Sequence, residues 1–171
     1  MSMNISQSML PEFDMETANT RKTLERVPDG NGDFRPHPKS MAMNRLAGHL
    51  VEVPMWALMT LGQDELDMNP AGESPYAAFI MGSREAALEK FDEDVAKARA
   101  LLASTSDEAM MGTWTLKNAG QTIMALPRVA VMRSFVMNHM VHHRAQLGVY
   151  LRMNNVAVPS IYGPSADEGG M

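Results

Sequence analysis

The residues best suited to chemistry in this sequence are the histidines of the stretch HMVHHRAQ, at positions 139–146. His139 and His143 are four residues apart, so on an α-helix their directions differ by only about 40° and both rings can reach one metal ion. His142 points about 60° from His139 and about 100° from His143, which makes it the outlier. Such a pair is a weak signal alone, because two half-buried histidines bonded to carbonyls or carboxylates show the same spacing.

His49, within the apolar stretch RLAGHL, is the natural candidate for a third ligand. Its neighbours Leu46 and Val53 are apolar, which predicts that the ring faces the core. Gly48 beside it lets a neighbouring backbone approach closely. A lone histidine on an apolar face is more often a hydrogen-bonded core residue than a ligand. Three imidazoles converging in an apolar bundle are harder to explain as packing, because each must be hydrogen-bonded or metallated.

Three further side chains are candidates for substrate handling. Gln146 and Tyr150 follow the histidine pair along the same helical stripe, where they are placed to touch a ligand or water above the metal. Glu52 lies about 60° around the helix from His49 and could be a general base or the partner of a ligand imidazole. The simpler alternative for Glu52 is a solvated carboxylate or a salt bridge.

The donor set limits the chemistry that a metal here could perform. The chain has no cysteine, so histidine nitrogens or oxygen atoms must be the ligands and any thiol must come from a small molecule. Zinc or nickel suits neutral imidazoles, with iron or manganese as further options. Three protein ligands leave coordination positions open, which is typical of catalytic ions. An open position could hold a water of lowered pKa or a substrate thiolate.

Helical periodicity predicts the elements that must position these residues. Four helices are expected, at about residues 9–26, 40–61, 84–102 and 127–154, with Ser40 and Ser83 as N-caps and Pro54 kinking the second. Residues 114–126 favour a short hairpin or an extended loop. Residues 156–171 form a non-helical tail, either loose or packed near the pocket mouth or a dimer seam. The pattern predicts one all-α domain over residues 1–171, a four-helix bundle with long loops.

Composition narrows the possible partners. The 171 residues include 15 basic and 20 acidic side chains, a net charge of -5, which argues against a grip on nucleic-acid phosphates. No signal peptide or apolar run of about 18 residues is visible, so we expect a cytoplasmic protein without a membrane span. Of 18 methionines, those in or beside helices are expected to be core or interface filler: Met55, Met59, Met124, Met132, Met137, Met140 and Met153.

Four segments resemble the DinB family. They are residues 138–152 around HMVHHRAQ, the tail VPSIYGPSADE at 158–168, PHPKSM at 36–41 and LAGH at 46–49. The resemblance implies a DinB/YfiT-like four-helix bundle, usually a homodimer, with a divalent metal bound by three histidines. Carried over to this sequence, those are His49, His139 and His143. The wider superfamily includes thiol-dependent transferases and isomerases, which implies that a low-molecular-weight thiol is a possible cofactor.

These observations favour a metal-dependent enzyme that acts on a small molecule, either a hydrolase or a thiol-dependent transferase. The alternative is a non-enzymatic metal-binding or stress-response bundle of the DNA-damage-inducible type, with no direct contact to DNA. A third possibility is a bundle that oligomerises around a methionine-rich face and binds no ligand.

Overall fold

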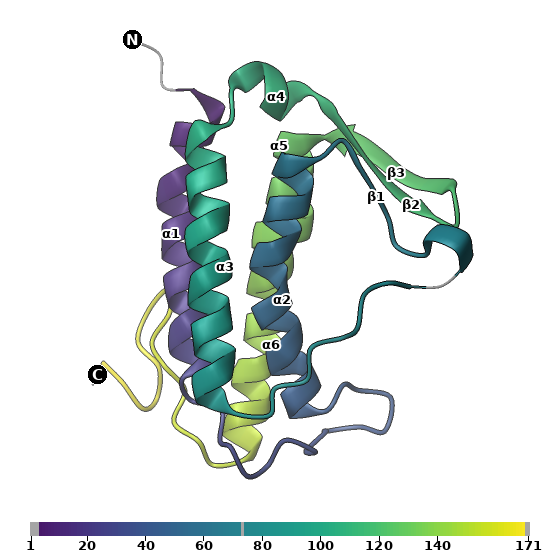
Figure 1. Cartoon of the computed structure of the whole chain (residues 1–171). Helices are drawn as coiled ribbons and strands as arrows, with labels where there is room; N and C mark the ends of the chain where they lie inside the picture. Colours follow the sequence, from purple (N-terminus) through teal and green to yellow (C-terminus); the bar gives the residue numbers. More distant parts are fainter. Residues whose placement is uncertain (1–3, 73, 170–171) are drawn as a thin grey trace.

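The core of the molecule is a four-helix bundle, which the computed structural model describes over residues 4–72 and 74–169. In Figure 1, α1 and α3 lie side by side, and α2 lies against α6. Contacts between α2 and α3 and between α1 and α6 join the two pairs. The helices are α1 (Ile5–Leu24), α2 (Met43–Gly62), α3 (Arg84–Ser104) and a last, composite helix of α5 (Arg128–Val131), η2 (Met132–Asn138) and α6 (His139–Met153). The predicted bundle is therefore confirmed.

The bundle forms because each helix buries an apolar stripe. In α3, Phe91, Ala98 and Leu102 are fully buried, on the stripe that the periodicity predicts. Met132, Met137 and Met140 of the composite helix are also fully buried, so they are core filler as expected, whereas Met153 is 54% exposed. No helix within the described residues is long and apolar enough to cross a membrane.

Helices α3 and α2 begin for different reasons. A local side-chain cap sets the start of α3, and contacts with the preceding loop set the start of α2. The Ser83 side chain accepts a hydrogen bond from the Ala86 N–H at 3.2 Å, so the predicted N-cap of α3 is confirmed. Ser40 is not a cap, because α2 begins only at Met43. There the loop supplies the acceptors: Phe34 O and Gly32 O receive the N–H groups of Met43 and Asn44. Backbone carbonyls thus replace the expected hydroxyl.

A small sheet at one end of the bundle corrects the all-α prediction (Figure 1). β2 (Thr113–Asn118) and β3 (Gln121–Pro127) form the antiparallel hairpin that the sequence left open. Its two-residue turn, Ala119 and Gly120, has φ values of 49° and 77°, as a type I′ turn requires. β1 (Glu65–Asp67) joins β2 in parallel, with Glu65 opposite Thr115. Two short helices, η1 (Pro70–Gly72) and α4 (Asp107–Met111), complete the connections.

The composite last helix changes its winding directly before the histidines. η2 is a π-helix, with wider turns than the α-helical segments α5 and α6 on either side of it. It ends at Asn138, and His139 is the first residue of α6. Such segments are rare and occur often at functional sites, so the winding itself marks this part of the bundle.

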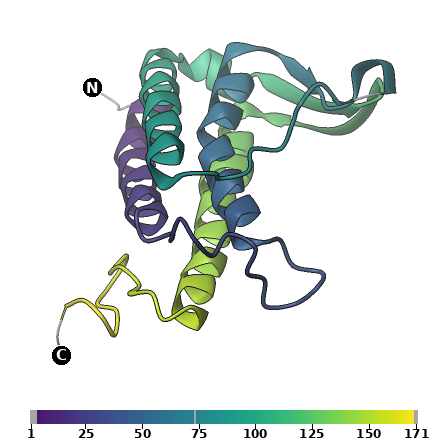
Figure 2. The same cartoon turned by 60° about the horizontal axis from the view of Figure 1, so that its bottom comes forward.

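The tail, residues 156–169, is non-helical as predicted and packs on the bundle. Figure 2 shows it running from the end of α6 past α1. The Tyr162 hydroxyl donates to the Glu16 carboxylate on α1 and accepts from Arg144 on α6. Residues 170 and 171, the end of the predicted tail, lie outside the described residues, as do residues 1–3 of the expected domain. The tail therefore covers the α1–α6 seam and takes no part in the histidine cluster described next.

Candidate metal centre

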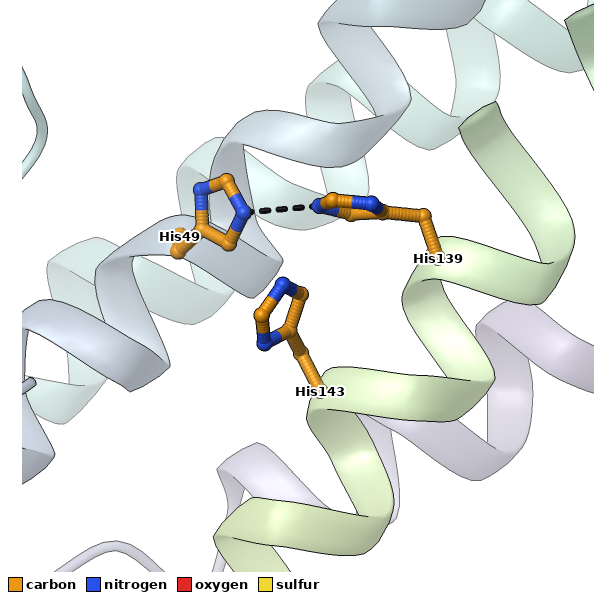
Figure 3. A group of neighbouring side chains, drawn as sticks. All are labelled: His49, His139 and His143. Atoms are coloured by element: carbon orange, nitrogen blue, oxygen red, sulfur yellow. Dashed lines mark hydrogen bonds between the residues drawn. The ribbon is translucent and has the colours of Figure 1, made fainter. Parts of the chain in front are cut away.

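Three histidines from two helices meet inside the bundle, as Figure 3 shows. His49 comes from α2, and His139 and His143 come from α6. One nitrogen of each ring lies within 4.8 Å of the corresponding atoms of the other two, and the Nε2 atoms of His49 and His139 are 2.8 Å apart. His49 and His143 are each only 9% exposed. The four-residue spacing and the apolar setting of His49 thus bring together the three residues that the sequence analysis selected.

A second segment of backbone passes very close to α2 at Gly48, the residue before His49. The strap, defined here as residues 74–82, crosses α2 at Gly48, where a Cβ would lie 2.1 Å from the Phe79 carbonyl oxygen. Only glycine leaves room for this crossing. The strap is held there by polar contacts: the Phe79 N–H donates to Glu52, and its carbonyl accepts from Arg45 at 3.3 Å. The expected role of Gly48 in allowing a close approach is confirmed.

The partners of the outer ring nitrogens orient two of the three imidazoles. His49 Nδ1 lies 3.2 Å from Glu52 Oε2, and His143 Nδ1 lies 2.8 Å from Gln146 Oε1. Because both partners are oxygen acceptors, each Nδ1 carries the proton and each Nε2 presents a lone pair. These lone pairs, together with His139, face a common centre (Figure 3). Hydrogen bonds of this kind fix the tautomer and ring orientation of metal-binding histidines.

Burial lowers the pKa of two of the three imidazoles, His139 and His143. Desolvation lowers the pKa of His139 to about 4, with smaller contributions from the neighbouring rings of His143 and His49. Desolvation also lowers the pKa of His143, against the opposing hydrogen bond of Gln146. Burial by itself raises the pKa of Glu52, but hydrogen bonds from His49 and Phe79 and the charge of Arg45 bring it below its usual value. His139 and His143 are therefore neutral nitrogen ligands near neutral pH, beside the ionised carboxylate of Glu52.

This donor set fits a divalent metal ion. Metal ligands of this type must be deprotonated, and the depressed pKa values of His139 and His143 meet that condition near neutral pH. Within the cluster only one proton can lie between His49 and His139, so three inward nitrogens cannot all be hydrogen-bonded to one another. A cation satisfies all three at once. Three imidazoles from two rigid helices are also the ligand type and number of open, catalytic sites.

A pocket of about 700 Å³ opens directly beside the cluster. His49, Glu52 and Trp56 of α2 form one wall, and the strap forms another. The Trp56 ring lies edge-on to His49, and its centroid is 5.0 Å from that of His139, so it forms part of the pocket wall next to the cluster. Two methionines predicted as filler, Met55 and Met59, line this pocket instead of the core. The site thus combines a candidate ion position with an adjoining space for a small molecule.

The remaining predicted residues occupy defined places around the cluster. Gln146 is bonded to His143, as described above, and donates to His142 at 3.1 Å. His142 itself is exposed, as expected for the outlier. The Tyr150 hydroxyl donates to the Met41 carbonyl at 3.1 Å and lines a second, smaller pocket next to His143. Glu52 is buried and paired with both His49 and Arg45, so it is not a solvated carboxylate.

Sequence reasoning missed Arg45 and the strap. Arg45, His49 and Glu52 follow one another at spacings of four and three, which places them on one helical face. That spacing could have found Arg45. No local signal marks the strap, since its contacts come from α2, more than 25 residues earlier in the chain.

Comparison with known proteins identifies the family to which this chain belongs. The DinB family model matches residues 1–169, so the chain belongs to the DinB family. The uncharacterized protein YrdA of Bacillus subtilis (strain 168) is 26% identical over 162 residues, covering 93% of this chain and 89% of its own.

Two crystal structures share the fold. A DinB-like protein from Bacillus cereus ATCC 10987 superposes with a TM-score of 0.69 at 21% identity, over 95% of this chain and 100% of that one. The DinB-like protein YjoA of Bacillus subtilis gives a TM-score of 0.66 at 15% identity, over 90% and 96%. At these identities the two structures support the architecture and say nothing about activity.

Proposed function

We propose that this protein is a metal-dependent enzyme acting on a small molecule in the pocket beside the three histidines. The observation that carries the proposal is the convergence of three inward nitrogens from two helices, one of which, on His49, also lines a pocket of about 700 Å³. In this proposal His49, His139 and His143 bind one divalent ion, with zinc or nickel as the first choices for imidazole ligands.

The ion, once bound, supplies a Lewis acid with open coordination positions. The chain's own residues do the rest. Glu52 and Gln146 hold the Nδ1 protons of His49 and His143 and thereby keep both rings aimed at the ion. Trp56 excludes water from one side of the site. Tyr150 and Gln146 do not line the larger pocket and lie instead at the second, smaller pocket next to His143.

Two reaction classes fit this arrangement. A hydrolase would use the open position for water, whereas a transferase would use it for a low-molecular-weight thiol, since the chain contains no cysteine of its own. Glu52 is the nearest carboxylate for proton transfer in either case. We further propose that the protein acts as a homodimer in the cytoplasm, as expected from the family resemblance and the sequence.

The decisive experiment is metal analysis of protein purified without a histidine tag. We expect about one divalent ion per chain in the wild type and none in a His139→Ala, His143→Ala double variant. His37→Ala is the matched control, because His37 is exposed and is not one of the three clustered histidines. Metal content in the double variant equal to that of the wild type would rule out this site.

Activity then separates the enzyme from a non-enzymatic metal-binding or stress-response protein. Metal-loaded wild type is screened against esters, amides and thiol–electrophile pairs, beside the double variant and the His37→Ala control. Turnover that follows metal content supports the enzyme. Full metal occupancy without turnover of any substrate class, together with a large fall in melting temperature on chelation, favours a structural or sensing role.

A further inference from the structure

We propose that Arg45 forms a carboxylate-binding subsite in the pocket beside the three histidines, so that the ligand of this pocket is a small molecule with an apolar body and a carboxylate group. The inference rests on the proposed function in one respect: it takes this pocket as the place where the substrate binds. It adds the chemical class of the substrate and a residue that recognises it.

The guanidinium of Arg45 has one engaged nitrogen and one open edge. Its Nη1 donates to Glu52 Oε2 at 3.1 Å and to the Phe79 carbonyl at 3.3 Å. Its Nε and Nη2 make no hydrogen bond within residues 4–72 and 74–169. In that same part of the chain, every buried side-chain nitrogen or oxygen has a partner. The two free nitrogens are therefore accessible, and the residue lines the pocket.

The open edge has the geometry that recognises a carboxylate. Nε and Nη2 present two parallel N–H groups, which match the two oxygens of one carboxylate. This protein already uses the same edge elsewhere: Arg99 Nε and Nη2 donate to the two oxygens of Asp14 at 2.7 and 2.9 Å. At Arg45 the corresponding partner is missing within the described residues. A ligand carboxylate would complete the same arrangement.

Arg45 is also held in place before any ligand arrives. Its side chain is 25% exposed, and its contacts to Glu52 and Phe79 fix the guanidinium between α2 and the strap. A restrained side chain loses little conformational entropy when it binds a partner. Less of the free energy of the interaction is therefore offset by that loss. Most exposed arginines of this chain differ from Arg45. They are not restrained in this way, or they already pair with a carboxylate, as Arg133 does with Glu12.

The rest of the lining suits an apolar body. Met55, Met59 and Met68 line the pocket with Trp56 and Leu66. Flexible thioether side chains adapt to ligands of different shape, so these residues accept an aryl or alkyl group without demanding one outline. The apolar body would pack here while the carboxylate lies at Arg45.

The charges near the pocket favour an anion in spite of the acidic chain. Arg45 and Lys90 both line the pocket, and Glu52 is its only carboxylate among the described lining residues. Glu52 is occupied by His49, Arg45 and the Phe79 N–H. Lys90 is paired with Asp94 at 2.9 Å and adds a smaller attraction. A divalent ion at the three histidines would add further positive charge to this region.

The test compares one carboxylate with its uncharged analogue. Binding of 4-phenylbutanoate and of 4-phenylbutanamide to the zinc-loaded full-length protein is measured by titration calorimetry. The two probes have the same apolar body, so their difference reports the charged group. We expect the carboxylate to bind about tenfold more tightly or better, the usual size of a charge-assisted hydrogen-bonded pair.

Variants assign that preference to Arg45. Arg45→Gln should abolish it, and Arg45→Lys should retain only part of it, because lysine keeps the charge and loses the paired N–H groups. Arg133→Gln, an exposed arginine on η2, is the matched control and should leave the preference unchanged. If Arg45→Gln fails to fold, Arg45→Lys alone still tests the paired contact. Equal binding of the two probes to the wild type, no binding of either, or an undiminished preference in the variants would overturn the proposal.

A repeat after chelation separates this inference from the metal site. A carboxylate preference that disappears with the ion and survives Arg45→Gln shows that the ion holds the carboxylate, and the proposal fails. A preference that persists in chelated wild type and is lost in Arg45→Gln supports it. The metal content of each preparation is measured separately, so a failure of the proposed metal site is recognised independently of the result for Arg45.

Discussion

The polar clusters at the α1–α6 and α2–α6 seams of this bundle differ in how their hydrogen bonds are balanced. At the α1–α6 seam, Arg144 and Glu16 pair at 2.6 Å with side chains only 4% and 6% exposed. Arg144 also donates to the Glu16 carbonyl, to Thr20 and to the Tyr162 hydroxyl. At the α2–α6 seam, three histidine nitrogens face one another with at most one proton to share between His49 and His139.

The difference indicates which cluster is structural. The Arg144 cluster contains its own donors, acceptors and both charges, so it is complete without any ligand. The histidine cluster has a surplus of acceptors: three ring nitrogens lie close together, with at most one proton between two of them. A surplus of this kind is satisfied by a cation. The same protein thus uses one buried polar cluster to join its helices and, in our proposal, the other to hold an ion.

Breaking the structural cluster should have the largest effect on stability. Arg144→Met leaves the buried Glu16 carboxylate without its cation, which typically costs about 3–5 kcal/mol and should lower the melting temperature by about 10 °C. Metal content should stay near that of the wild type. Thermal and urea unfolding measure the change. Arg133→Gln, which breaks an exposed ion pair, is the control. A Glu16→Leu, Arg144→Met double variant should lose less, because neither charge remains alone.

Gly48→Ala tests the strap that supports the histidine cluster. The added methyl group would meet the Phe79 carbonyl at 2.1 Å, so the strap must move away from α2. We expect a stability loss of about 1–3 kcal/mol, as for other overpacked sites, measured by urea unfolding. Gly82→Ala is the control, since nothing lies within 4 Å of its added Cβ. Equal stability of the two variants would contradict the tight crossing at Gly48.

Glu52→Gln tests whether the carboxylate orients His49. Loss of the charge facing His49 Nδ1 should weaken metal affinity by about tenfold to a hundredfold, measured by competition with a chelator. Glu93→Gln is the matched control, because that carboxylate is exposed on α3 and pairs with Lys97. An affinity equal to that of the wild type would show that the proton on His49 needs no charged acceptor.

Of these variants, Tyr162→Phe should have the smallest effect on stability. It tests how much the tail contributes to the Arg144 cluster. The hydroxyl lies 2.8 and 2.7 Å from the two Glu16 oxygens, and its removal costs about 1 kcal/mol while Arg144 and Glu16 stay paired. Tyr76→Phe is the control, since this exposed tyrosine makes no hydrogen bond through its hydroxyl within the described residues. A loss as large as that of Arg144→Met would show that the tail, rather than the ion pair, holds the seam together.

Much of the candidate site could be predicted from the sequence because it depends on helices. Spacing along α6 fixes the relative direction of His139 and His143, and the apolar neighbours of His49 fix the face that it occupies. The same periodicity predicts the bundle. These inferences need only local geometry and the burial of an apolar stripe.

The missed features depend on contacts between distant segments. β1 has only three residues, and it forms a strand because β2, about 50 residues later, offers it a parallel partner. The start of α2 is set by Phe34 and Gly32 of the preceding loop, which overrides the hydroxyl of Ser40. The pairing of Arg144 with Glu16 likewise joins two ends of the chain. Neither composition nor periodicity carries that information.

The π-helix η2 has a consequence for changes in chain length. Its seven residues, Met132–Asn138, occupy wider turns than an α-helix needs, so this segment can lose one residue and remain helical. Because a π-turn holds more residues than an α-turn, such a deletion would rewind the segment as α-helix and leave α6 in nearly the same orientation relative to α5. The three imidazoles would then still meet, whereas the loss of one residue from a regular α-helix would turn everything after it by about 100°. The winding of these seven residues thus lets the chain lose one residue here without turning two of the three histidines away from the third.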